Sequence, residues 1–356
     1  MLFEKIDFEN KSHIEKFIIT KKFDCNTWED YYNSYNYALK CILEEGFSKN
    51  YDLNCKAKCI LFLIRHSIEL CLKLNLYNKK LPIPNSHIFK DLISAYPEDY
   101  KFQVSLIKIL HLIDLDKDGS CYRYVANKDT NANYFTHEDV TKVYEILQLH
   151  WSLNNTTEFE IGTIFPEMEF SKIKKWDLTF HLGEANLLGP LRTQYDQCIE
   201  VLVVGIIEDR FDVNEIFVPL MFLIRHSLEL ALKSNIIEVQ NFSTLIKGKD
   251  YSNEHSLARL FNCYHDYLTK VDFSKLSQEL NKEIEIYLIE YAKLNEVIHQ
   301  LDKNSQHFRF PTNVKGDFHN IQLSKISFID VLKLYYYTDP FLTFSNNVLE
   351  ENGILV

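Results

Sequence analysis

Residues that break helices and form tight turns are scarce in this sequence. Its 356 residues include only 9 Gly and 8 Pro, which leaves little material for the many turns of an all-β sandwich. Charged residues make up 25% of the chain and hydrophobic residues 46%, so the composition does not indicate a long disordered tail. Aromatic residues, by contrast, are plentiful, with 21 Tyr and 25 Phe. Together these features predict long helices packed through aromatic side chains.

No apolar run is long enough to cross a membrane. The best candidates, 59–64 and 201–207, are stopped by Arg65 and Glu208, well short of the roughly 18–20 residues that a spanning helix needs. The first 17 residues are rich in charge and lack the apolar core of a signal peptide. We therefore expect a soluble, cytoplasmic protein with no membrane partner.

Motifs for metals and cofactors are missing as well. None of the 8 cysteines forms a CxxC pair, and the close pair Cys55 and Cys59 has no second Cys or His pair at zinc-site spacing. The sequence also lacks P-loop, GxGxxG, GxSxG and HExxH motifs. We expect reduced cysteines, no metal and no cofactor.

The chain does contain an internal duplication. Residues 62–73 read FLIRHSIELCLK and residues 222–233 read FLIRHSLELALK, so that only two of these positions differ at an offset of 160. Chance does not produce such a match within one chain.

Two weaker matches follow in the same order, one around an Asn-x-His motif and one around an Arg-aromatic motif. They pair residues 85–92 with 253–260 and residues 115–127 with 301–313. We therefore expect two copies of one domain, the first over residues 1–155 and the second over residues 156–356.

Capping and turn residues predict four or five helices in each copy. In the first copy we expect helices over 28–45, 54–76 and 100–114, with others opening at Asn85 or Ser86 and at Thr136. In the second copy we expect helices over 190–208, 214–236 and 276–300, with others opening at Asn253 and at Ser324 or Ser327. Residues 158–169 fit either a short strand pair or a linker. The predicted fold class is all-α, with two tandem four- to five-helix bundles.

The duplicated block places a polar stripe on a largely apolar helix. Arg65 and Glu69 are one turn apart and can form an ion pair, and His66, Glu69 and Lys73 follow one face. Charges on a buried helix must be paired or face a hydrated cleft. One alternative is that the stripe fixes helix packing; the other is that Arg and His line a cleft for phosphate or a nucleotide. The second copy repeats it with Arg225, His226, Glu229 and Lys233.

Two further duplicated pairs are candidates for substrate binding. His87 and His255 are expected in the first turn of their helices, where a neutral imidazole suits the helix dipole better than a cation does. Arg123 and Arg309 lie among aromatic residues after Asp-Lys loops. Each could pair with a loop carboxylate or contact an RNA phosphate.

Together, the RHSxELxLK block, the Asn-x-His motif and the Arg-Tyr or Arg-Phe-Pro segment resemble the HEPN superfamily of small helical bundles. The similarity is greatest to bacterial members found near defence and toxin–antitoxin loci. Many HEPN proteins are metal-independent ribonucleases whose site forms where two units pair. The resemblance thus implies that the two copies pair about a pseudo-twofold axis within this chain. It implies a catalytic set of Arg65, His66, Glu69, Arg225, His226 and Glu229, and a binding set of Lys73, Lys233, His87, His255, Arg123 and Arg309.

In that mechanism His66 and His226 would act as acid or base on a ribose 2′-hydroxyl, while the two arginines neutralise the phosphate and the two glutamates orient them. The family's second His, a few residues beyond the Arg, is missing from both blocks. The only Arg with a His at this spacing is Arg259, with His265, and this pair is not duplicated. Two functions stay open: engagement of RNA or a nucleotide in bacterial stress or antiviral defence, with or without cleavage, and a non-catalytic helical module that binds a partner protein.

Overall fold

The structure is a computed structural model, and the helices account for nearly all of its regular structure. It describes residues 6–19, 27–48, 54–98, 119–120, 122–124, 188–242, 250–251, 253–293, 297–298, 307–313, 315–319 and 328–355. Within these ranges all elements of regular secondary structure are helices, and one isolated β-bridge joins Thr312 and Phe318. The all-α fold class is confirmed for this part of the chain.

The first copy contains four α-helices and one 3₁₀ turn within the described residues. They are α1 (Lys11–Lys16), α2 (Trp28–Ser48), the 3₁₀ turn η1 (Asn54–Lys56), α3 (Ala57–Asn78) and α4 (Phe89–Ser94). At the start of α2, the hydroxyl of Thr27 accepts the backbone N–H of Asp30 at 3.1 Å, as expected of a capping box. Gly46 does not end this helix as predicted, because one glycine costs a helix only about 1 kcal/mol.

The second copy contains five α-helices and one 3₁₀ turn within the described residues. They are α8 (Leu188–Ile207), α9 (Val213–Phe242), α10 (Leu257–Leu268), the 3₁₀ turn η3 (Phe273–Lys275), α11 (Gln278–Lys293) and α13 (Phe328–Glu351). Helix α9 continues beyond the predicted end at residue 236 and contains Pro219. Proline has no N–H for the carbonyl of Glu215 one turn earlier. The hydroxyl of Ser34 on α2 donates to that carbonyl instead, at 2.6 Å.

The third helix of each copy begins later than the sequence predicts. Helix α4 starts at Phe89 and α10 starts at Leu257, so His87 and His255 lie in the loops before these helices and not in their first turns. Before α4, the hydroxyl of Ser86 accepts the N–H of Ile88 at 3.1 Å. This local bond favours a turn over a helix at that point. The segments predicted at 100–114, from Thr136 and at 158–169 lie outside the described residues.

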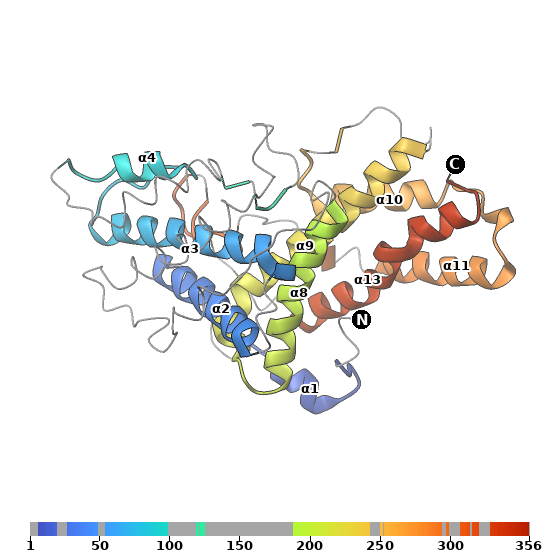
Figure 1. Ribbon diagram of the computed structural model, residues 1–356, viewed down its shortest axis with the longest axis horizontal. Coiled ribbons are helices and arrows are strands. Elements are labelled where there is room, and N and C mark those ends of the chain that lie inside the picture. Colours follow the sequence, from blue (N-terminus) through green and yellow to red (C-terminus); the bar gives the residue numbers. More distant parts are fainter. Residues whose placement is uncertain are drawn as a thin grey trace.

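Helix α9 lies at the centre of the arrangement. It packs against α8, α2, α10 and α13, while α2 also packs against α3 (Figure 1). Every residue of α3 from Ala57 to Leu76 is buried, so the polar stripe of this helix is internal. None of the described helices is both long and apolar enough to cross a membrane.

Candidate functional site

A buried carboxylate on α3 gathers three basic side chains. Oε2 of Glu69 lies 2.8 Å from Nη1 of Arg65. Its Oε1 atom lies 2.8 Å from Nζ of Lys73 and 2.8 Å from Nδ1 of His87. Burial alone raises the pKa of Glu69, but Lys73, His87 and Arg65 outweigh that effect, and the pKa lies well below its ordinary value. Glu69 is therefore ionised, and we call these four residues the Glu69 cluster.

The second copy builds the same cluster on α9. Glu229 lies 2.8 Å from Nη1 of Arg225, 3.0 Å from Nζ of Lys233 and 2.9 Å from Nδ1 of His255. Burial again raises the pKa of Glu229 by itself, and His255, Arg225 and Lys233 lower it well below the ordinary value. The duplicated stripe therefore has one geometry in both copies.

Both arginines of the stripe make hydrogen bonds within the protein. Nη2 of Arg65 donates to the backbone carbonyl of His87, and Arg225 donates in the same way to His255. The guanidinium of Arg65 also lies 4.6 Å from the ring centre of Phe89. These contacts favour the first alternative for the stripe, in which Arg and Glu fix packing.

His66 and His226 each bind a backbone segment from the opposite copy. Nε2 of His66 lies 2.9 Å from the carbonyl oxygen of Arg309, and Nε2 of His226 lies 2.9 Å from that of Arg123. Two tyrosines hold the same segments: Tyr35 donates to the carbonyl of Phe308, and its equivalent Tyr195 donates to that of Tyr122. The exchange is reciprocal, and we call 122–124 and 307–310 the exchanged segments.

Neither of these histidines reaches solvent in this structure. His66 is 0% exposed and His226 is 1% exposed. Burial lowers the pKa of both, in the case of His226 to about 3, so both imidazoles are neutral and donate Nε2–H to a carbonyl. The two rings belong to one stack, in which His66 lies on Phe62, Phe62 on Phe222 and Phe222 on His226, with centroids 5.4, 4.9 and 5.6 Å apart. Two phenyl rings thus separate the expected acid–base groups.

The two arginines of the exchanged segments differ in their surroundings. Arg309 is buried and its guanidinium lies 5.0 Å from the centre of the Phe310 ring. Burial and the nearby charge of Arg123 lower the pKa of Arg309 to about 10, which leaves it charged at neutral pH. Its Nε makes no hydrogen bond to a described residue. Arg123 is half-buried and donates to the carbonyl of Gly119 at 2.7 Å.

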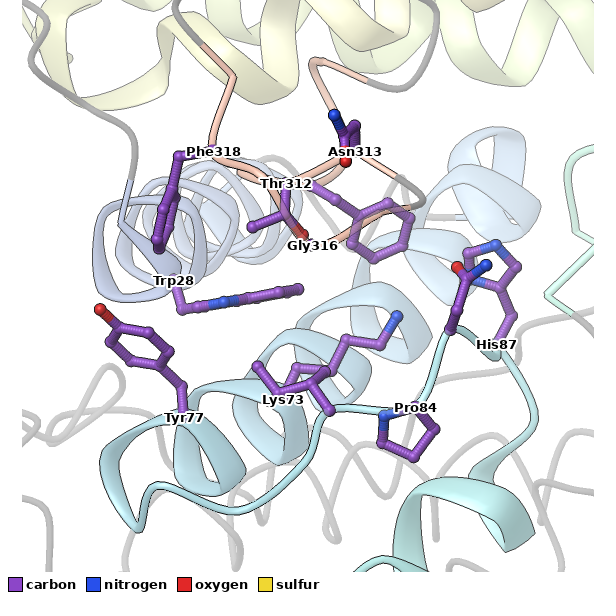
Figure 2. A pocket seen from close by; sticks show the side chains of 12 residues that line it. Trp28, Lys73, Tyr77, Pro84, His87, Thr312, Asn313, Gly316 and Phe318 are labelled. Atoms are coloured by element: carbon purple, nitrogen blue, oxygen red, sulfur yellow. The ribbon is translucent and has the colours of Figure 1, made fainter.

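One pocket brings members of the expected binding set to the surface. It has a volume of about 140 Å³, and Lys73 and His87 of the Glu69 cluster line it. Figure 2 shows the indole of Trp28 lying across the pocket, with Tyr77 and Phe318 on one side and His87 on the other. Its lining residues are Trp28, Lys73, Tyr77, Ile83, Pro84, Asn85, His87, Phe310, Thr312, Asn313, Gly316 and Phe318.

The protonation state of His87 follows from its partner. Burial lowers the pKa of His87 despite the opposing effect of Glu69, so the imidazole is neutral at pH 7. The ionised Glu69 can only accept a hydrogen bond, and Nδ1 of His87 therefore carries the proton. Nε2 keeps its lone pair and makes no hydrogen bond to a described residue, while the side chain is 38% exposed. His87 can thus accept a proton or a hydrogen bond from a ligand.

Several pocket residues could not be recognised from the sequence. Trp28 reads only as the start of a helix, and Tyr77 and Phe318 belong to no motif and to different copies. They meet because an exchanged segment and the turn after it fold over α2 and α3, which no local pattern indicates. The aromatic richness of the chain was the only available hint.

The comparisons with known proteins give no match. No protein-family model, no curated protein and no solved structure matches this chain. Its chemistry therefore has to be inferred from the geometry of its own residues.

Proposed function

We propose that this protein is an HEPN-like protein, built from two tandem bundles paired about a pseudo-twofold axis, that engages RNA or a nucleotide in bacterial stress or antiviral defence. The observation that carries the proposal is the His87–Glu69 pair. A buried carboxylate orients a half-exposed neutral imidazole toward a pocket, with Nε2 available to a ligand. The reciprocal contacts of His66 and His226 with the exchanged segments support the pairing of the two bundles.

The charge around the pocket supports an anionic ligand. Arg65 and Lys73 contribute two positive charges against the single carboxylate of Glu69, which leaves one positive charge in the cluster. Arg309, beside Phe310 of the pocket wall, adds another. The chain as a whole has a net charge of −11, so this region is a local basic site that the overall charge does not reveal.

The same imidazole fits metal-independent RNA cleavage. Nε2 of His87 would take the proton of a ribose 2′-hydroxyl, whose oxygen then attacks the adjacent phosphorus. A 2′,3′-cyclic phosphate forms, and the released 5′-oxygen takes a proton from solvent. His87 replaces His66 and His226 in this role because those two histidines are enclosed by protein. The basic groups nearby would stabilise the charge on the phosphate.

A second candidate function is a non-catalytic helical module that binds a partner protein. Exposed apolar side chains on the second copy favour it: Ile286 and Ile289 of α11 and Tyr337 and Phe344 of α13 are each about half exposed. Large exposed apolar side chains that gather in a patch often mark protein-binding surfaces.

The test measures binding and cleavage of a 5′-labelled single-stranded RNA in EDTA, with the full chain and with His87→Gln. We expect the wild-type chain to bind RNA, and the variant to bind more weakly and to lose any cleavage. His13→Gln, on α1 and away from the pocket, is the matched control and should behave as wild type. Absence of RNA and nucleotide binding by the wild-type chain would refute the proposal and leave the protein-binding module.

A further inference from the structure

We infer that the pocket at Trp28, beside the Glu69 cluster, holds one unstacked nucleobase, and that the surroundings of Glu229, where Leu188 and Ile237 stand in place of Trp28 and Tyr77, do not. This inference rests on the proposed function and names the part of the ligand that the pocket recognises. The aromatic walls, the polar groups and the size of the pocket support it, together with the differences between the two copies.

The pocket walls contain rings from four segments, of which two, Trp28 and Phe310, are buried. Trp28 comes from α2, Tyr77 from α3, Phe310 from an exchanged segment and Phe318 from the turn that follows it. Tyr77 and Phe318 meet edge to face, with centroids 6.0 Å apart and planes at 86°, and both rings are nearly half exposed. Single-stranded nucleic acids are commonly held by bases stacked on exposed aromatic side chains of this kind.

The positive charge of Lys73 indicates which class of planar ligand the pocket can hold. Its ammonium group lies 4.3 Å from the ring centre of Phe310 and 5.9 Å from that of Trp28. An aromatic cage for a cationic ligand needs free ring faces, whereas these faces already meet a cation that would repel a second one. A neutral ring that carries an anionic phosphate therefore fits better than an ammonium ligand.

The polar groups at the pocket match the edge of a base. The amide of Asn85 offers both a donor and an acceptor to a base, while Nε2 of His87 stays available for the ribose 2′-hydroxyl. The side chain of Asn313, in contrast, is used within its own turn, where its oxygen accepts the N–H groups of Lys315 and Asp317. A nucleobase presents donors and acceptors side by side in one plane, and an amide side chain can pair with such an edge.

The size of the pocket limits how much of a nucleotide can enter. Its volume of about 140 Å³ is below the roughly 300–1,000 Å³ of sites that enclose a drug-sized molecule. One ring system therefore fits, and the sugar and phosphate stay outside, where Arg309 and the positive charge of the Glu69 cluster can attract them.

The second copy keeps the cluster but differs at two of the ring positions. At the offset of 160, Leu188 stands where the first copy has Trp28, and Ile237 stands where it has Tyr77. The equivalent of Phe310 is Tyr124, whose hydroxyl lies 3.1 Å from Nδ1 of His255. The cluster around Glu229 thus retains its structural contacts, while two ring positions of the first pocket are aliphatic here.

The test compares Tyr77→Ala with Ile237→Ala, two partly exposed residues at equivalent positions of the two copies. Affinity is measured by fluorescence anisotropy of a labelled RNA octamer with the full chain. Removing a stacking ring raises Kd roughly 5- to 100-fold, so we expect this loss for Tyr77→Ala and no change for Ile237→Ala. Phe318→Ala, with Phe344→Ala as its control, provides a second pair in case one variant folds poorly.

Competition with small molecules identifies the source of the base. Uridine and guanosine 5′-monophosphates and ribose 5-phosphate are added to the bound octamer. Displacement by the mononucleotides but not by ribose 5-phosphate supports a free nucleotide, and displacement by neither supports a base within RNA. If the octamer binds and Tyr77→Ala and Phe318→Ala bind it as tightly as their controls, the base pocket is refuted while RNA engagement stands. If the wild-type chain binds neither octamer nor nucleotide, the proposed function itself fails.

Discussion

The strongest quantitative consequence of the structure is a loss of stability in mild acid. His226 is enclosed by protein, and burial lowers its pKa to about 3, whereas an unfolded histidine titrates near 6.5. The unfolded chain therefore binds the proton first as the pH falls. The contribution of this group to stability is complete above about pH 6.5 and is lost progressively between pH 6.5 and 3.

The size of the effect follows from the difference in proton binding. A pH of 5 lies about 1.5 units below the pKa of an unfolded histidine. At 1.36 kcal/mol per unit, proton binding to the unfolded chain at this pH lowers stability by about 2 kcal/mol through His226. His66 has its pKa lowered by the same cause and should change stability in the same direction. The contribution of His226 alone is a sizeable part of the 5–15 kcal/mol by which folded proteins are typically stable.

The assay is urea unfolding at pH 7.5 and pH 5, with wild-type protein and with His226→Gln. The variant cannot take up the proton, so its stability should fall by about 2 kcal/mol less than that of wild type between the two pH values. His13→Gln, on the surface helix α1, should show the wild-type difference. An unchanged difference in His226→Gln would mean that this imidazole titrates in the folded protein, and would return His66 and His226 to the set of accessible acid–base groups.

Three further predictions concern the duplicated contacts. Glu69→Gln and Glu229→Gln should each destabilise the protein by about 3–5 kcal/mol, measured by urea unfolding, because each leaves buried cations without their carboxylate; a change below about 1 kcal/mol in either would contradict the equivalence of the clusters. Phe62→Ala should cost about 3–5 kcal/mol, seen as a lowered unfolding midpoint, because it leaves a cavity in the central ring stack; a smaller effect than for an exposed phenylalanine would contradict that packing. Gly119→Ala should destabilise the protein more than Gly316→Ala in the same assay. Both glycines have a positive φ, but only at Gly119 would the new Cβ lie close to another side chain, 2.9 Å from Nη1 of Arg65. Equal effects of the two substitutions would contradict the position of Gly119 beside Arg65.

The sequence was informative where interactions are local. Arg65 and Glu69 are one turn apart on a helix, and their ion pair could be predicted from that spacing alone. The starts of α2, α8 and α11 were predicted to within two residues, and at α2 the Thr27 cap acts directly on the neighbouring backbone. The duplication then showed that the same contacts should occur twice, which the two glutamate clusters bear out.

The contacts between the copies could not be predicted in the same way. The bond from His226 to the carbonyl of Arg123 joins residues 103 positions apart, and it involves a backbone atom that every residue type has. The late start of α4 depends on a competing local bond, in which the hydroxyl of Ser86 accepts the N–H of Ile88. The sequence does not reveal this bond, because serine is favoured both at helix caps and in turns. The pocket depends on both effects, since the loop before α4 supplies His87 and an exchanged segment supplies Phe310.

The most direct test of the account is to crosslink RNA to the intact protein and map the site. A single-stranded RNA containing 4-thiouridine is bound in EDTA, irradiated and digested, and the attached peptides are identified by mass spectrometry. The account predicts attachment at Tyr77 and Phe318, the exposed aromatic residues of the pocket beside His87, and its loss when free nucleotide or RNA competes. Crosslinks confined to α11 and α13, or divided equally between the surroundings of His87 and of His255, would contradict it.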